Sequence, residues 1–243
     1  MSRRIAAAWL VLLLVPVAIA AQEPGNPRDA RLRRDLGEAL MRLRDAELRT
    51  VSAVQGSDND PAALERGRPE FTEHAEALAH TRALLDTVVF GTTWGASELE
   101  RLRAAYPRSA LLDRYAAALL LRQGHADEAA AAYAALVART NVDAALHHEH
   151  GRALERSGSR TGALTAHERA LELDPSHEAA FRALVRLHRE EGTLVELLTQ
   201  VQRLQLRRPD AEHLVTWEVE LLHRTGRHSD AHAAAARLQR NDS

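Results

Sequence analysis

Residues 158–175 read GSRTGALTAHERALELDP, and residues 124–139 read GHADEAAAAYAALVAR. Each segment starts with a glycine, passes a few polar residues and continues as a run rich in helix formers. The leading glycine recurs every 34 residues, at Gly124, Gly158, Gly192 and Gly226. A second column keeps the same interval, at Pro107, Asn141, Pro175 and Pro209. The spacing predicts one structural unit that recurs along the C-terminal half of the chain.

Each column of the repeat has a physical role. Apolar residues at helical spacing precede each glycine, as Leu184, Val185 and Leu187 do before Gly192. We expect the glycine to end this first helix in the left-handed conformation, because it has no Cβ. A second helix follows and ends before the proline. Where the two helices cross, small residues let the backbones approach closely: Ala129, Ala163 and Ala231.

The composition agrees with an all-α fold. The 243 residues are 45% hydrophobic and only 4% aromatic, so the residues that favour strands are scarce. Cysteine is absent, so stability must come from packing without disulfides. The net charge of −2 gives no reason to expect a nucleic-acid partner. Every basic residue is arginine, which fits either a GC-rich genome or selection for bidentate contacts to carboxylate or phosphate.

The N-terminus has the pattern of a secretory signal peptide. MSRR is basic, residues 5–20 are apolar, and Ala18 and Ala20 are small residues before a polar stretch. We therefore predict a signal peptide over residues 1–20, a linker over 21–27, and export to the periplasm or beyond. A retained membrane anchor is the alternative, although the apolar run is short for a bilayer span and contains Pro16. No membrane span is expected after cleavage.

The ending ALELDP at residues 170–175, with Gly151, Gly158 and Ala163 in phase, resembles the tetratricopeptide repeat (TPR) family, a 34-residue helix–turn–helix repeat. Of the family's usual aromatic column, only Phe181 is aromatic here. The resemblance implies an all-α, right-handed α-α superhelix. It implies four units, at residues 110–143, 144–177, 178–211 and 212–243.

Upstream of the repeats, two further helical regions are predicted. Residues 71–109 read as a degenerate hairpin, with helices at 73–90 and 96–106 joined by GTTWG. Residues 28–56 form an N-terminal amphipathic helix, and residues 57–70 form a loop. This helix either makes a coiled coil with another chain or packs on the first hairpin.

The resemblance also implies a concave groove, lined by the first helix of each unit, that holds an extended peptide or a helix of a partner. Arginine outnumbers glutamate there, which favours an acidic segment or a free carboxylate. The alternative is that these arginines are solvated or pair with glutamates one turn away. The family's carboxylate clamp is absent, since the chain has no lysine. The predicted partner-binding residues are Arg114, Arg122, His148, Arg152, Arg156, Arg182, Arg186, Arg189 and Arg224.

HHEH at residues 147–150 is the strongest chemical signal in the sequence. His147 and His150 lie on one helical face, and with His167 they have a spacing that suits a divalent metal. All three fall in columns that normally pack the hairpin core, so neutral histidines filling aromatic positions are favoured over a metal site. HExxH and the other catalytic motifs are absent. We therefore expect no catalytic residue, no metal, no cofactor and no enzymatic activity.

The predicted function is that of a non-enzymatic scaffold or adaptor of the cell envelope. It would bind an extended peptide or helix of a partner protein in the concave groove, and Arg152, Arg182 and Arg186 would contribute to that binding. The alternative is a structural subunit of an envelope assembly. Such a subunit would dock through the N-terminal helix and through the C-terminal end at Ala233, Ala234 and Leu238.

Overall fold

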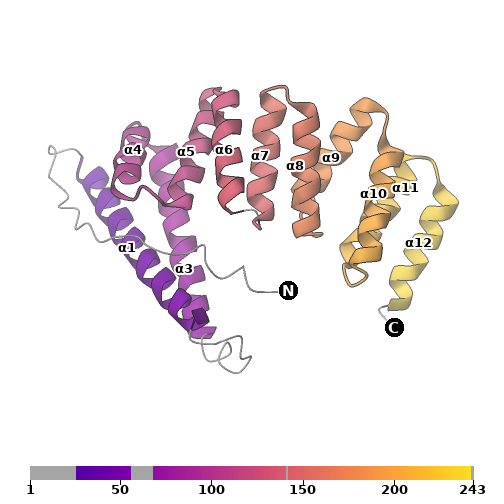
Figure 1. The fold of residues 1–243 in the computed structure, drawn as a ribbon, viewed down its shortest axis with the longest axis horizontal. Coiled ribbons are helices and arrows are strands. Elements are labelled where there is room, and N and C mark those ends of the chain that lie inside the picture. Colours follow the sequence, from indigo (N-terminus) through magenta and orange to yellow (C-terminus); the bar gives the residue numbers. More distant parts are fainter. Residues whose placement is uncertain (1–25, 56–67, 141, 242–243) are drawn as a thin grey trace. The chain divides into compact units, whose positions relative to one another are not determined.

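The computed structural model describes residues 26–55, 68–140 and 142–241, and this part of the chain contains helices without any β-strand (Figure 1). The expectation of an all-α protein is confirmed for these residues. The predicted signal peptide, most of the predicted linker and most of the predicted loop lie outside the described residues. The chain divides into two compact units, Met1–Leu119 and Leu120–Ser243, which are taken in turn.

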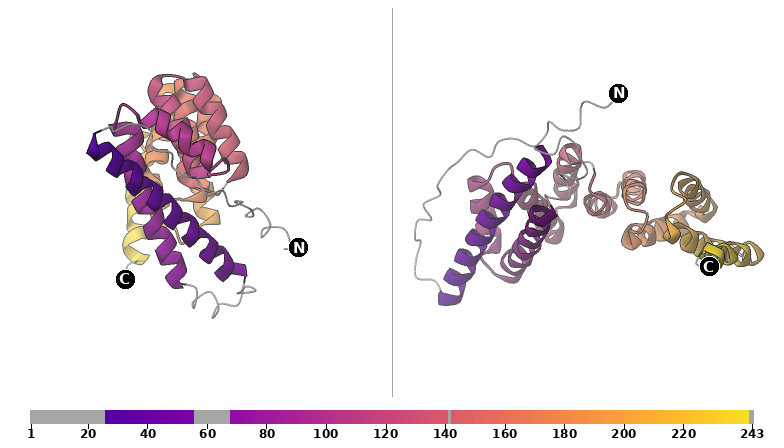
Figure 2. Two further views of the ribbon diagram at one scale, coloured as in Figure 1. Left: turned by 90° about the vertical axis from the view of Figure 1, so that its left-hand side faces the viewer. Right: turned by 90° about the horizontal axis from the view of Figure 1, so that it is seen from below.

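The first unit is built on a long N-terminal helix that packs alongside the second (Figure 2). Thr81 on the second helix donates a hydrogen bond from Oγ1 to the carbonyl oxygen of Ala39 on the first, over 3.2 Å. The helix therefore packs on the first hairpin, which is one of the two arrangements that its sequence allowed. In order, the elements are α1 (Pro27–Gln55), α3 (Arg68–Leu85), the π-helix η1 (Asp86–Phe90), α4 (Gly95–Ala105) and the start of α5 (Ala110–Gln123).

The buried face of α1 is the apolar stripe that its sequence predicts. Its side chains join those of η1, α4 and α5 in one core, which includes Leu36, Leu40, Leu85, Val88, Leu99 and Leu112. The boundary predicted for the following hairpin was wrong at its start. The loop was expected to reach residue 70, but α3 begins at Arg68.

The connection between η1 and α4 depends on close backbone contact. The helix predicted over residues 73–90 ends as a π-helix, and α4 starts at Gly95, within the GTTWG segment. A Cβ on Gly95 would lie 2.1 Å from the carbonyl oxygen of Val88, so only glycine fits there.

The second unit is a series of antiparallel helices in which each packs against the next along the chain (Figure 1). The arrangement is repeat-like. The helices that follow α5 are α6 (Ala126–Arg139), α7 (Ala144–Arg156), α8 (Arg160–Leu173), α9 (Glu178–Glu191), α10 (Leu194–Arg207), α11 (Glu212–Arg224) and α12 (His228–Asn241).

The four glycines of the repeat end their helices in the way that their spacing predicts. They have positive φ angles of 89°, 81°, 73° and 76° at Gly124, Gly158, Gly192 and Gly226. At Gly192, the glycine N–H donates to the carbonyl of Arg189 and the Thr193 N–H donates to that of His188. This pair of bonds is a Schellman motif, and the backbone makes the same pair at the other three glycines.

The core of the second unit follows the apolar columns. The alanines predicted at the helix crossings, Ala129, Ala163 and Ala231, are fully buried, and Leu197 takes the same position in the remaining unit. Ala234, one of the residues expected to expose an open C-terminal end, is 1% exposed and packs inward instead. The side chain of Leu238 lies outside the described part of the chain. No helix within residues 26–55, 68–140 and 142–241 is both long and apolar enough to cross a membrane.

Candidate functional site

A groove of about 410 Å³ lies between α9 and α11, the first helices of two successive units. Four of the arginines predicted to bind a partner, Arg182, Arg186, Arg189 and Arg224, meet in it. The groove is lined by Glu178, Phe181, Arg182, Val185, Arg186, Arg189, Trp217, Glu220 and Arg224. We call it the α9–α11 groove.

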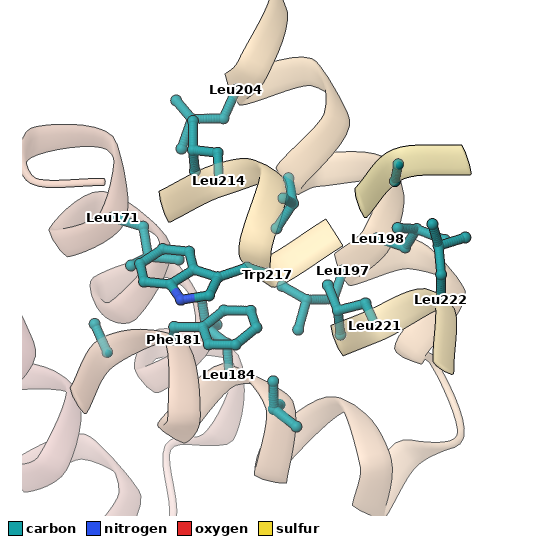
Figure 3. Packing of buried hydrophobic residues seen from close by; sticks show 14 of the residues in the cluster. Leu171, Phe181, Leu184, Leu197, Leu198, Leu204, Leu214, Trp217, Leu221 and Leu222 are labelled. Atoms are coloured by element: carbon teal, nitrogen blue, oxygen red, sulfur yellow. The ribbon is translucent and has the colours of Figure 1, made fainter. Parts of the chain in front are cut away.

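Two stacked aromatic residues are among those that line the α9–α11 groove. The ring of Phe181 and the indole of Trp217 lie 4.4 Å apart between centroids, with an interplanar angle of 4° (Figure 3). Their exposed fractions are only 1% and 7%, so the rings mainly hold α9 against α11. The aromatic column of the repeat identified Phe181. Trp217 was missed because it lies in a different column and reaches Phe181 only through the packing of the two helices.

Two of the rim arginines pair with glutamates one turn earlier on their own helices. Arg182 pairs with Glu178 on α9, and Arg224 Nη2 lies 2.8 Å from Glu220 Oε1 on α11. Both arginines therefore pair with a glutamate one helical turn away, as the alternative in the sequence analysis predicted. The Arg182 and Glu178 side chains are 75% and 65% exposed, and such pairs contribute only about 0–1 kcal/mol.

Arg189 differs from the other arginines of the groove. It is exposed, and it makes no side-chain hydrogen bond or ion pair with any residue that the structure describes. Among the described residues, its guanidinium N–H donors therefore have no hydrogen-bond partner. Among the arginines that line this groove, it is the one best placed to take a ligand carboxylate.

Arg186 is held from the adjacent hairpin. It forms an ion pair with Glu155 on α7, and its Nη1 also lies 3.5 Å from Glu190 Oε1 on its own helix. Glu155 in turn accepts a hydrogen bond from Nε2 of His167, over 2.8 Å. His167 is fully buried, and its Nδ1 lies 3.2 Å from Nδ1 of His148. We call this series His148–His167–Glu155–Arg186 the histidine chain.

The environment of the histidine chain disfavours protonated imidazole. Burial, followed by the neighbouring His167 and His177, lowers the pKa of His148 to about 4. Burial also lowers the pKa of His167, against the opposing effect of its hydrogen bond to Glu155. Both rings are therefore neutral at pH 7.

The other predicted groove residues lie elsewhere. Arg156 donates from Nη1 to the carbonyl oxygen of Leu121 over 3.1 Å, so it ties α7 to the end of α5. Arg152 is exposed on α7 but does not line the α9–α11 groove, and Arg122 is exposed at the end of α5. His148 was expected in the groove, but its half-buried ring packs against the rings of His167 and His177. Arg114 is half-buried on α5, in the part of the chain assigned to the first unit.

The histidines considered as metal ligands in the sequence are His147, His150 and His167. His147 is buried at 6% exposure, and Nδ1 of His148 lies 3.2 Å from Nδ1 of His167. Burial lowers the pKa of His150, which lies near His147. Among the described residues, no group of three or more His, Asp or Glu side chains is arranged to hold a metal ion.

The sequence matches no protein-family model and no curated protein. Among solved structures, the crystal structure of BtubC (BKLC) from P. vanneervenii is similar to this chain, with 14% sequence identity and a TM-score of 0.40. The likeness covers 86% of this chain and 90% of that chain. A likeness at this level identifies neither a family nor a function.

Proposed function

We propose that this chain is a non-enzymatic scaffold of the TPR type that binds an acidic segment of a partner protein in the α9–α11 groove. In this proposal the helical hairpins form a right-handed superhelix, and the bound segment is extended or helical. The pattern of residues 1–20 supports export to the cell envelope as the place of action. The observation that carries the proposal is the meeting of four predicted arginines in one groove, with Arg189 unpaired among the described residues.

The charge and shape of the groove support an acidic ligand. Four arginines and two glutamates line the groove, and each of these glutamates forms a solvent-exposed ion pair. Guanidinium groups grip carboxylates with two parallel hydrogen bonds, which adds geometric selectivity to the charge. Near-complete burial of Phe181 and Trp217 keeps the two helices at a fixed spacing, so the arginines are presented on a rigid surface.

Site-specific photocrosslinking followed by affinity measurement tests the proposal. A photoreactive residue replaces Arg182 in the groove or, as a control, Arg203, which is exposed on α10 outside the groove lining. We expect a discrete partner to crosslink from position 182 and not from position 203 in the native envelope fraction. With that partner purified, charge reversal by Arg182→Glu, Arg189→Glu and Arg224→Glu together should weaken binding by about tenfold or more. Arg203→Glu should leave the affinity unchanged.

Two results would remove the groove as the binding site. One is a crosslinking pattern that is identical at positions 182 and 203. The other is a triple variant that binds the partner as tightly as the wild type. Circular dichroism of each variant ensures that a weaker affinity does not reflect unfolding.

One observation favours the second candidate, a structural subunit that docks through its N-terminal helix. Met41, Leu48 and Val54 on α1 are 52%, 54% and 49% exposed, although the opposite face of the helix is buried. Deleting α1 would uncover the core of the first unit, so the sharper test is Met41→Glu with Leu48→Glu. A lower mass in solution than the wild type supports an assembly through this face, and an unchanged mass argues against it.

A further inference from the structure

The histidine chain joins three helices. His148 and Glu155 lie on α7, His167 lies on α8, and Arg186 lies on α9, where it also lines the α9–α11 groove. His167 is enclosed within the hairpin, and a Cβ on Gly151 would lie 2.5 Å from its Cε1. The imidazole therefore has a fixed position, and Glu155 is the link from it to Arg186.

The positions of the protons follow from the partners. An ionised carboxylate only accepts hydrogen bonds, so Nε2 of His167 carries the proton that is donated to Glu155. In a neutral ring Nδ1 of His167 must then be the acceptor, and Nδ1 of His148 donates to it. One added proton can enter at Nε2 of His148. A second proton would place two N–H donors against each other at 3.2 Å and break the contact.

Two arginines, a further histidine and one carboxylate face the histidine pair from the elements packed against it. Arg152 and Glu155 face it from α7, His177 from the start of α9, and Arg186 from within α9. Of these groups only Glu155 is negative, and Arg186 already shares it. A protonated histidine therefore competes with Arg186 for one carboxylate and repels its guanidinium.

We propose that the histidine chain is an acid-sensitive latch between the α7–α8 hairpin and α9, which holds Arg186 at the rim of the groove near neutral pH and releases it in acid. The latch itself needs no ligand. Its consequence, a groove whose arrangement of cations changes with pH, rests on the proposed function.

The direction of the pH effect follows from linkage. The pKa of His148 in the closed structure is lowered to about 4 by burial, whereas an exposed histidine titrates near pH 6.5. The opened state therefore takes up protons before the closed state does. The closed state is at full stability above pH 6.5 and loses stability as the pH falls toward 4. If the pKa of His148 shifts in full, the equilibrium constant between the closed and opened states changes roughly 30-fold at pH 5. Because the ring is partly exposed, we expect a change of about tenfold.

Hydrogen–deuterium exchange on the purified chain tests the latch without any ligand. After correction for intrinsic rates, we expect protection in α7, α8 and the first turns of α9 to fall about tenfold between pH 7.5 and pH 5.0. Protection in α11 and α12 serves as the internal control and should change much less. In His148→Gln, the amide can still donate to Nδ1 of His167 but cannot be protonated, so the loss of protection should shrink to about twofold or threefold.

Two results would overturn the latch: protection in α7 and α8 that is unchanged at pH 5.0 in the wild type, or an equal loss in His148→Gln. If this variant fails to fold, NMR titration of the wild-type imidazoles decides instead, because a His148 midpoint above pH 6 refutes the proposal. These readouts are separate from partner binding. A failed affinity test leaves the latch standing, and a failed latch leaves the groove standing.

Discussion

Gly151 on α7 faces the imidazole of His167 on α8 so closely that a Cβ on residue 151 would lie 2.5 Å from the ring. One repeat later, Val185 and Val201 occupy the corresponding positions, and both belong to the core of the second unit. The two facing positions of the hairpin are therefore filled by different combinations of side chains in successive units. A large ring faces no side chain in one unit, and two side chains of medium size take those positions in the next.

Gly151→Ala should destabilise the protein by about 1–3 kcal/mol, because the added methyl group forces the buried His167 ring to move. Alanine has a higher helix propensity than glycine, by about 1 kcal/mol. This gain offsets part of the steric cost, so the measured destabilisation is the difference between the two. Gly162→Ala on α8 is the matched control, since its nearest neighbour is the rotatable Ser159 hydroxyl at 2.9 Å. Urea unfolding followed by circular dichroism gives both values. A Gly151→Ala variant as stable as the control would show that the ring is not confined.

Trp217→Ala should cost about 3–5 kcal/mol, since it removes the larger ring of a stacked pair that is almost fully buried. Trp217→Phe keeps a stacked ring against Phe181 and should cost clearly less. The free energy of unfolding measured in urea compares the two variants. A loss below 1 kcal/mol in Trp217→Ala would mean that the stack does not hold α9 against α11.

Gly192→Ala should cost about 1–2 kcal/mol, because an L-residue is strained at φ 73°. Nothing lies within 4 Å of the added Cβ, so the cost comes from the backbone alone. Gly91 offers the control, because its surroundings are equally open and its φ is −106°. Gly91→Ala should be neutral or slightly stabilising. Thermal unfolding of the two variants should therefore shift in different directions or by clearly different amounts.

Tyr115→Phe should cost about 1 kcal/mol at pH 7, because the hydroxyl lies 2.9 Å from Asp86 Oδ1 and 3.0 Å from the Arg82 carbonyl oxygen. Burial, followed by the hydrogen bond to Asp86, raises the pKa of Tyr115 above its ordinary value. A raised pKa stabilises the fold below pH 10, and this stability is lost as the pH rises beyond it. The difference between wild type and variant should therefore disappear near pH 11. Urea unfolding at pH 7, 10 and 11 checks this, and a constant difference would contradict it.

Much of the fold could be predicted because its signals are local. The end of each repeated helix is encoded by a glycine such as Gly192, whose backbone preference acts without any partner. The π-helix before Gly91 could not be predicted. It lies where Gly95 approaches the carbonyl of Val88, a contact between segments that no local sequence pattern encodes.

The candidate site was predictable only in part. Helical spacing places arginines such as Arg182 and Arg189 on the polar face of α9, and the resemblance to the TPR family implied that this face lines a groove. The spacing carried no information about their partners. Arg186 forms an ion pair with Glu155, 31 residues away in the sequence, and Arg156 donates a hydrogen bond to the carbonyl oxygen of Leu121. His148 was expected among the groove residues for the same reason, but it turns toward His167.

Helix-forming composition, the 34-residue interval and the glycine and proline columns are properties of short segments, so reading along the chain is enough to place each helix of the repeat. Ion pairs, ring stacking and burial arise between segments that are distant in the sequence. The stacking of Phe181 on Trp217, the unpaired state of Arg189 among the described residues and the neutral histidine pair therefore appear only after the helices have packed. Packing sets the distances and the dielectric surroundings on which charge and affinity depend.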